Sequence, residues 1–350
     1  MFARSSLAAL VLAAVSVSAA PGLSLALSGP QSVASVSALH VTATLVNTGD
    51  VELKLLNDPR TILNPFETDS FAITDAAGNA PSFSGAVVKY VPEQVLAANL
   101  ESSFTVLAPG ASIEVTHDLS KAYNFTAVGE GSYDIAAANK LQYVDPATNA
   151  LVTIYADVAE ASHTASLSGQ LAVSRHSAIS KRIGYQSCST SRQSTLVTAA
   201  AAAQTYANNA VTYLNANTAS TTRFVTWFGT FTSAHRTTVL SHYTKMAAAK
   251  YADYTYDCSC TDSDVYAYVF PNEFGTIYLC GVFWSTTTTG TDSRAGTLIH
   301  ESSHFTRLAG TDDIVYGQTG AKALAKSNPA QAIMNADSHE YFAENTPAQT

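Results

Sequence analysis

The chain has 350 residues, which is long enough for two domains, and its composition indicates neither disorder nor a fibrous repeat. It is acidic, with a net charge of −9, and only 13% of its residues are charged. This balance excludes the basic surface that binds DNA or RNA, so we expect no nucleic-acid partner. After the N-terminal segment, no apolar run approaches the roughly 18 residues that span a bilayer, and we expect no membrane partner.

Residues 1–20 have the pattern of a secretory signal peptide. Arg4 supplies a basic start, residues 7–15 form an apolar core that is too short to cross a membrane, and residues 16–20 are the small side chains of a cleavage site. The pattern predicts a secreted, extracellular protein. Asn124 begins the sequon Asn-Phe-Thr, a glycosylation acceptor in such a protein.

Residues 21 to about 178 are predicted to form strands. Apolar and polar residues alternate in segments such as 39–46 and 112–117, and turns rich in Gly, Pro, Asn and Asp separate these segments. Short strands at this spacing are typical of an antiparallel β-sandwich. The region has no cysteine, which excludes a cysteine switch. We interpret its scattered histidines as polar residues rather than metal ligands: His40, His117, His163 and His176.

Lys181 and Arg182 form a dibasic pair in the polar stretch that follows. The pair has two interpretations. It is either a processing site for a kexin-like protease or a solvated pair of surface charges, and the position of the next domain distinguishes the two.

All four cysteines lie in the second half of the chain, at Cys188, Cys258, Cys260 and Cys280. In an oxidising compartment this even number predicts two disulfides, and four cysteines allow three pairings. A bridge between Cys258 and Cys260 would be strained because a single residue separates them, so two pairings remain.

The second half begins with predicted helices and continues with predicted strands. Residues 194–216 and 233–250 carry apolar residues at helical spacing. Residues 265–270 and 276–284 are apolar or alternating, and we expect them to pair in a small sheet.

A further helix is predicted over residues 296–307, and from residue 300 onward the chain reads H-E-S-S-H-F-T-R-L-A-G-T-D-D-I-V-Y-G. Residues four apart share one face of a helix, so His300 and His304 can bind one metal ion while Glu301 lies beside it. A catalytic zinc site has three protein ligands and one open position. Asp313 is the nearest candidate for the third ligand.

A last helix is predicted from Pro329 through about Glu344. Asp337 and Glu340 lie three residues apart and therefore share a face of this helix. On their own, acidic residues on a helix indicate a solvated surface.

Residues 310–317, G-T-D-D-I-V-Y-G, match the pattern G-T-x-D-x-x-Y-G that follows H-E-x-x-H in the aspzincin metallopeptidases. From about residue 184 to residue 350 the chain resembles this family, and most of all its fungal peptidyl-Lys metalloendopeptidases. The resemblance implies one catalytic zinc ion, a general base and a tyrosine that assists the transition state. The corresponding residues are His300, His304 and Asp313 as zinc ligands, Glu301 as base, and Tyr316.

The resemblance also bears on what the residues alone leave open. It favours a disulfide between Cys188 and Cys258 and another between Cys260 and Cys280. The segment around Asp337 and Glu340 resembles the one in which peptidyl-Lys metalloendopeptidases hold an acidic pair that binds the substrate lysine. Broad-specificity deuterolysins share the zinc motifs without this pair.

Because the resemblance begins within a few residues of Lys181 and Arg182, it favours processing at the dibasic pair. The sequence then predicts a signal peptide at residues 1–20, a β-sandwich-like propeptide at 21–183 and a zinc metallopeptidase domain at 184–350. The resemblance implies an α+β fold with a zincin-like catalytic domain, mostly helical with a small antiparallel sheet. In zincins an edge strand of that sheet pairs with an extended substrate.

The leading hypothesis is a secreted zinc endopeptidase, made as a proenzyme, that hydrolyses peptide bonds on the amino side of lysine, with Lys at P1′. Its expected partners are proteins or peptides that contain lysine and a kexin-like processing protease, and we expect a monomer. Two alternatives remain. One is a deuterolysin-like zinc endopeptidase of broad specificity, and the other is a secreted β-sandwich binding protein with an inactive peptidase domain.

Overall fold

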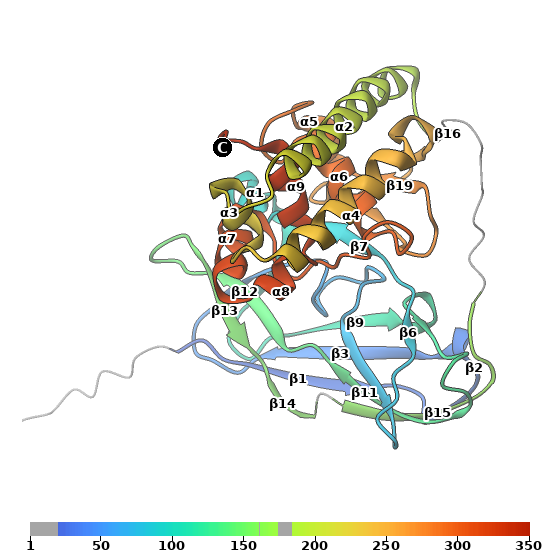
Figure 1. Cartoon of the computed structure of the whole chain (residues 1–350). Helices are drawn as coiled ribbons and strands as arrows, with labels where there is room; N and C mark the ends of the chain where they lie inside the picture. Colours follow the sequence, from blue (N-terminus) through green and yellow to red (C-terminus); the bar gives the residue numbers. More distant parts are fainter. Residues whose placement is uncertain (1–19, 161, 174–183) are drawn as a thin grey trace, which may run out of the picture.

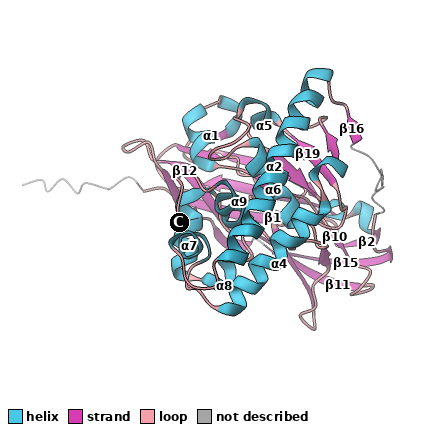
Figure 2. Cartoon of the chain, turned by 45° about the horizontal axis from the view of Figure 1, so that its top comes forward, coloured by secondary structure: helices cyan, strands magenta, loops and turns pink. Residues whose placement is uncertain are grey.

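The computed structural model describes residues 20–160, 162–173 and 184–350, with most strands in the first half and most helices in the second. The strands of the first half lie below the helices in Figure 1, and the helices lie over the strands in Figure 2. This mixed α and β architecture confirms the predicted fold class at that level. Residues 1–19 of the predicted signal peptide and the pair Lys181–Arg182 fall outside the described residues.

Eight strands of the first half form two sheets. They are β1 (Leu23–Ser28), β2 (Ser32–Ser35), β3 (His40–Asn47), β5 (Phe71–Asp75), β9 (Ser112–Asp118), β11 (Gly131–Ala137), β14 (Asp157–Glu160) and β15 (Ser162–Gln170). One sheet has the order β14-β1-β3-β9 and the other β2-β15-β11-β5. Burial alternates along β3, and its buried Leu45 lies opposite Leu25 of β1. The two sheets share one apolar core, to which the second contributes Ile73 and Ile135.

A third sheet lies in the same half. Its strands are β4 (Leu53–Leu56), β8 (Phe104–Leu107), β12 (Lys140–Val144) and β13 (Leu151–Tyr155), in the antiparallel order β13-β12-β4-β8. The half also contains the strand pair β6 (Ser82–Phe83) and β10 (Tyr123–Asn124), the helix α1 (Pro92–Ala98), and 3-10 turns at Val36–Ala38, Glu101–Ser103 and Leu119–Lys121.

The second half is built from helices packed around α6. They are α2 (Thr190–Ala216), α3 (Thr222–Phe228), α4 (Ser233–Ala249), α5 (Gly281–Ser285), α6 (Arg294–His304), α7 (Gly317–Ser327), α8 (Pro329–Ala332) and α9 (Ala336–Glu344), with a 3-10 turn at Tyr251–Asp253. Every residue of α6 after Arg294 is buried. The long helix α2 turns a buried alanine face, including Ala203 and Ala207, towards α4 and α6, which allows close packing. No helix in the described parts of the chain is long and apolar enough to cross a membrane.

A five-stranded sheet completes this half, and one of its strands comes from the first half. The strands are β7 (Val87–Lys89), β16 (Gly184–Gln186), β17 (Thr255–Asp257), β18 (Ala267–Val269) and β19 (Thr276–Leu279), in the order β16-β17-β19-β18-β7. The predicted small antiparallel sheet is therefore wrong in one respect: β16, β17 and β19 are parallel, and only β18 and β7 run antiparallel to their neighbours. In Figure 1, β7 reaches up from the strands into the helical half.

Two disulfides link the segments that follow strands of this sheet. Cys188 is bonded to Cys258, and Cys260 is bonded to Cys280, which is the pairing that the family resemblance implies. No described cysteine is free.

Two predicted elements differ from the structure in their extent. The strand expected over residues 276–284 stops at Leu279 and is followed by helix α5. At this turn Gly281 approaches the chain so closely that a Cβ atom would lie 2.7 Å from the Ser263 Cα atom. The single helix expected from Pro329 to Glu344 is divided into α8 and α9, because Asn335 takes an extended backbone conformation between them.

Candidate active site

Helix α6 positions three of the predicted residues. Its first turn is capped by Ser293, whose hydroxyl oxygen accepts a hydrogen bond from the Gly296 N–H at 3.0 Å. Gly296 also lets α9 come close, because a Cβ atom there would overlap carboxylate oxygens of that helix. The helix therefore runs through the core, where His300, Glu301 and His304 have no exposed surface.

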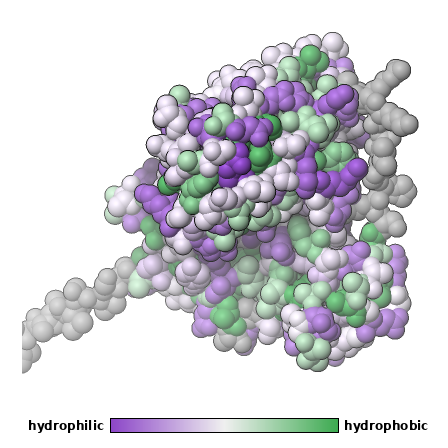
Figure 3. All heavy atoms as spheres, viewed as in Figure 1, coloured by the Kyte–Doolittle hydropathy of each residue, from purple (hydrophilic) through white to green (hydrophobic). Residues whose placement is uncertain are grey.

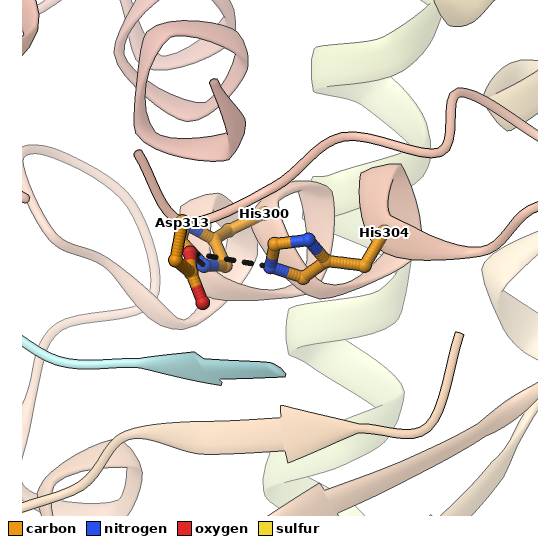
Figure 4. Close-up of side chains that lie close together, drawn as sticks. All are labelled: His300, His304 and Asp313. Atoms are coloured by element: carbon orange, nitrogen blue, oxygen red, sulfur yellow. Dashed lines mark ion pairs between the residues drawn. The ribbon is translucent and has the colours of Figure 1, made fainter. Parts of the chain in front are cut away.

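Asp313 completes a tripod with the two histidines (Figure 4). Its Oδ1 atom lies 3.1 Å from His300 Nε2 and 3.4 Å from His304 Nε2. Apart from these mutual contacts, the three buried atoms have no hydrogen-bond partner among the described residues. Two imidazole nitrogens and one carboxylate oxygen that converge in this way are a donor set of catalytic zinc sites. The residues present therefore fit a zinc ion.

Contacts behind the tripod fix the direction of each imidazole. His304 Nδ1 donates to the Thr311 carbonyl oxygen at 2.9 Å, and His300 Nδ1 lies 2.8 Å from Asp337 Oδ1. With Nδ1 engaged, each ring presents Nε2 to the metal position. The neighbouring carboxylate, Asp312, is exposed and accepts a hydrogen bond from the next backbone N–H, so it takes no part in the tripod.

The loop that carries Asp313 is held from behind by Asn335. The amide oxygen of Asn335 accepts hydrogen bonds from the Ile314 and Val315 N–H groups, both at 3.1 Å. Asn335 makes these hydrogen bonds from an extended backbone conformation, and the predicted last helix is therefore divided at this residue.

Glu301 lies beside the tripod without belonging to it. Its Oε1 atom accepts a hydrogen bond from the Lys89 N–H at 3.2 Å, and its Oε2 atom is buried with no partner among the described residues. Burial raises the pKa of Glu301 to about 7. A carboxylate with such a pKa can accept and return a proton near neutral pH.

Tyr316 directs its hydroxyl group at a backbone carbonyl. It donates a hydrogen bond to the Val88 oxygen, and its ring is covered by the Arg60 guanidinium at 3.9 Å from the ring centroid. Asp58 holds Arg60 in place through an ion pair of 2.9 Å. Because burial raises the pKa of Tyr316 well above its usual value, the hydroxyl keeps its proton and remains a donor.

A buried pocket next to the tripod holds the ammonium group of Lys89. Its Nζ atom lies 2.7 Å from Glu340 Oε2, 3.5 Å from Asp337 Oδ1 and 3.3 Å from Asp292 Oδ1. None of the Lys89 side chain is exposed. Although burial lowers the pKa of Lys89, the three carboxylates raise it well above its usual value. The pocket therefore keeps a lysine side chain charged in the absence of solvent.

Besides Lys89, the three acidic residues of the pocket contact different groups. Asp337 supports His300, as described above, and its Oδ2 atom accepts a hydrogen bond from the Gly317 N–H at 2.6 Å. Asp292 accepts a hydrogen bond from the Tyr341 hydroxyl at 2.7 Å. Glu340 has a second oxygen, Oε1, without a hydrogen-bond partner among the described residues.

The chain is similar to known metalloendopeptidases. A family model described as lysine-specific metallo-endopeptidase matches residues 213–344. The peptidyl-Lys metalloendopeptidase of Armillaria mellea is 60% identical over 354 aligned positions that cover 100% of both chains. This chain belongs to the lysine-specific metallo-endopeptidase family. It is therefore a zinc metalloendopeptidase.

Two further relatives come from Grifola frondosa. Its peptidyl-Lys metalloendopeptidase is 54% identical, with 98% of each chain covered. A solved structure of a zinc peptidase from the same organism is 56% identical; the match covers 47% of this chain and 100% of that chain, with a TM-score of 0.46.

The residues that family motifs single out meet at one place in this metalloendopeptidase. The structure brings together the tripod, Glu301, Tyr316 and the acidic pair, although Asp337 and Glu340 follow the motif helix by more than 30 positions in the sequence. Glu344, on the same helix, instead accepts hydrogen bonds from the Ser293 N–H and hydroxyl, and so supports the start of α6.

Sequence reasoning missed three residues of the site: Lys89, Asp292 and Asn335. For Lys89 a signal exists, since it is the single charge in the apolar run Val-Val-Lys-Tyr-Val. Asp292 lies in a polar turn-like segment and Asn335 follows the apolar run Ala-Ile-Met, and nothing in either local sequence indicates the distant contact that the residue makes.

Proposed function

We propose that this chain is the precursor of a secreted zinc endopeptidase that cuts peptide bonds on the amino side of lysine. One observation carries the proposal. A lysine side chain fills a buried acidic pocket while the peptide bond on its amino side lies between Glu301 and Tyr316. A lysine of a substrate in the same place would have its own amino-side bond at the reacting position.

The residues of the site have distinct tasks in this reaction. Zinc held by His300, His304 and Asp313 would polarise the scissile carbonyl and acidify a water molecule. Glu301 accepts the proton of the attacking water and returns it to the leaving nitrogen, for which its 3.2 Å contact with a peptide N–H is suitably placed. Tyr316 donates a hydrogen bond to the carbonyl oxygen as negative charge develops there.

The pocket explains a preference for lysine over arginine. Asp337, Glu340 and Asp292 place their oxygens around one point, which suits the compact ammonium group. The planar guanidinium group needs acceptors arranged side by side and more space. A neutral side chain would leave buried carboxylates without a cation, so it is accepted poorly.

The domain limits are part of the proposal: a signal peptide at residues 1–20, a β-sandwich-like propeptide at 21–183 and the enzyme at 184–350. Three features support it: the leader pattern, the dibasic pair Lys181–Arg182 as a site for a kexin-like protease, and the entry of β7 into the catalytic sheet. Apolar residues are scattered over the visible face in Figure 3, which supports a monomer. The tripod of His300, His304 and Asp313 supports one catalytic zinc ion.

Two alternatives make different demands on the site. A broad-specificity enzyme of the deuterolysin kind does not require a closed acidic pocket. An inactive binding protein does not require three unpaired metal-binding atoms with a base beside them. Both expectations disagree with the contacts of Lys89 and Asp313. The lysine-directed endopeptidase fits both.

The decisive experiment is to determine the cleavage sites of the processed protein on a peptide library. We expect strong enrichment of lysine at P1′ and none of arginine. An absence of lysine enrichment would overturn the proposed specificity. A companion variant, Lys181→Ala with Arg182→Ala, should accumulate a full-length precursor of low activity, and equal specific activity of precursor and processed protein would contradict an inhibitory propeptide.

A further inference from the structure

Strand β7 is bound in the cleft in the way an extended substrate is bound. It pairs antiparallel with β18, with Val87 opposite Val269, Val88 opposite Tyr268 and Lys89 opposite Ala267. It forms the edge of the sheet at this side, and in Figure 4 it is the pale blue strand below the three metal-binding side chains. An extended peptide that adds to an edge strand is a common mode of substrate binding.

The polar atoms around one peptide bond of β7 are engaged by the catalytic residues. The Val88 carbonyl oxygen accepts a hydrogen bond from Tyr316, and the Lys89 N–H donates to Glu301 Oε1 at 3.2 Å. On either side, the Val88 N–H donates to Asp313 Oδ2 at 2.9 Å and the Lys89 carbonyl oxygen accepts from the Tyr266 N–H at 3.1 Å. The bond between Val88 and Lys89 thus has its oxygen at the oxyanion donor and its nitrogen at the proton shuttle.

The Lys89 side chain specifies this register. Its ammonium group fills the acidic pocket, and a shift of the strand by one residue would turn the side chain to the other face of the sheet. Contacts of residues that follow the strand support the same register. Gln94 donates to Asp292 Oδ2 at 3.0 Å, and Tyr90 packs against the ring of Tyr316.

We propose that Val88–Lys89 is a self-cleavage site: the zinc-loaded precursor hydrolyses this bond of its own first half. The inference rests on the proposed function, because it uses the same site and the same preference for lysine. In the reaction the oxygen of water bonds to the Val88 carbonyl carbon and the C–N bond breaks. The Lys89 nitrogen takes the proton that Glu301 received from the water. The products are a carboxylate at Val88 and an amino group at Lys89.

The cut does not by itself separate the two pieces. The bond lies within β7, with strands β1 to β6 before it and strands β8 to β15 after it, and each of the three four-stranded sheets of the first half contains strands from both sides. The sheet hydrogen bonds and the shared core therefore hold the pieces together. We expect a nicked first half that remains attached to the enzyme until the chain is cut at its junction or unfolds.

The test uses the full-length chain with Lys181→Ala and Arg182→Ala, which removes the dibasic site. After incubation with zinc, mass spectrometry and N-terminal sequencing under denaturing conditions should find a fragment that begins Lys-Tyr-Val. The first-order rate constant for its appearance should not depend on protein concentration, because the bond and the catalytic groups belong to one molecule. Under native conditions both fragments should elute together. The matched chain with Glu301→Gln should remain intact.

A second measurement does not depend on turnover. In the full-length Glu301→Gln chain, Lys89→Ala should weaken the binding of β7 in the cleft. Lys89→Met is the companion variant that preserves side-chain volume. A labelled peptide of residues 85–91, Gly-Ala-Val-Val-Lys-Tyr-Val, should then bind at least about tenfold more tightly by fluorescence anisotropy, because a larger fraction of molecules has a free cleft. Lys140→Ala, at an exposed lysine of the first half, should leave the peptide affinity unchanged.

Two results would overturn the self-cleavage. One is a precursor that stays uncut at Val88–Lys89 in zinc while the processed protein cuts before lysine in peptides, a result that leaves the proposed function intact. The other is cleavage whose rate constant rises in proportion to protein concentration, since the bond is then cut by another molecule. Failure of the proposed function itself has a separate signature, which is a processed protein with no preference for lysine.

Discussion

The two halves of the molecule bury different kinds of side chain. The sheets of the first half enclose aliphatic and aromatic residues, and in β3 the buried residues Val41, Ala43 and Leu45 alternate with less buried ones. The helical half buries charge: Glu301, Asp337 and Glu340 have no exposed surface. Buried charges stabilise a fold poorly because they lose their hydration, so the helical half gives up stability for its chemistry. Its two disulfides supply a constraint that the cysteine-free first half does not use.

Lys89 is an exception to this contrast. It is a fully buried cation carried by the apolar half, and it lies against three buried carboxylates of the other half. Each side supplies what the other lacks. If the first half is removed as proposed, the three carboxylates would be free to bind a substrate cation, and maturation would open the pocket.

The largest expected effect separates chemistry from fold within the helical half. Glu301→Gln removes the proton shuttle but keeps the shape of the side chain, so kcat of the processed enzyme on a lysine peptide should fall by about 10² to 10⁴-fold. Zinc content, measured by mass spectrometry of the metal, should stay at the wild-type level because Glu301 is not part of the tripod. A variant with near-normal kcat would contradict the role of Glu301.

Removal of a disulfide should test the dependence of the helical half on covalent constraint. The bond Cys188–Cys258 joins residues 70 positions apart, and Cys260–Cys280 joins residues 20 apart. By the loop-entropy model, replacement of the first pair by alanine should lower the free energy of unfolding of the processed enzyme by about 4 kcal/mol, and that of the second pair by about 3 kcal/mol. Urea denaturation under oxidising conditions measures both. Equal midpoints for the wild type and the variants would show that the fold does not need the bridges.

Tyr316→Phe is expected to have a smaller effect than loss of Glu301, because it removes one hydrogen bond to the oxyanion and leaves the proton transfer in place. The loss of one such donor costs about 10² to 10³-fold in kcat. KM should change little if the bond strengthens only in the transition state, so steady-state kinetics on one lysine peptide distinguishes this role from simple substrate binding. A change in KM alone would assign Tyr316 to binding.

The contrast between the halves also explains what the sequence could predict. His300 and His304 were recognisable because the helix alone brings residues four apart together, and Asp337 and Glu340 share a helical face for the same reason. Alternation predicted the strands of the first half because one face of each packs on a core. These are local patterns, and the fold preserves them.

Contacts between distant segments were not predictable in this way. Lys89 and Asp292 are 203 positions apart and meet only because β7 crosses into the other half. The break between α8 and α9 depends on Asn335 binding N–H groups some 20 positions earlier in the chain. Such features depend on the tertiary arrangement, to which periodicity and spacing within one element give no access.

The smallest expected effects divide the acidic pocket by function. Glu340→Gln removes the shortest contact to the lysine ammonium, which is 2.7 Å in this structure. Asp337 keeps its contact of 2.8 Å with His300 Nδ1, which is shorter than the 3.4 Å between that atom and Glu340. Loss of one charged acceptor for a buried cation costs about 1 to 3 kcal/mol, so kcat/KM for lysine at P1′ should fall by about tenfold to a hundredfold. Asp292→Asn, at the longer distance of 3.3 Å, should cost about tenfold or less on the same reasoning.

Asp337→Asn should behave differently from both, because Asp337 serves the metal site as well as the pocket. Its Oδ1 atom is 2.8 Å from His300 Nδ1, and loss of such a partner behind a metal ligand typically costs about 10 to 100-fold in metal affinity or activity. Cleavage before residues other than lysine should therefore fall with Asp337→Asn and hold with Glu340→Gln and Asp292→Asn. Asp312→Asn, at the exposed neighbour of the zinc ligand, is the matched control and should change neither. If all three pocket variants reduced lysine and non-lysine cleavage in the same proportion, the acids would act only through the metal site. The three residues would then support the zinc ligands and would not form a pocket for the substrate lysine.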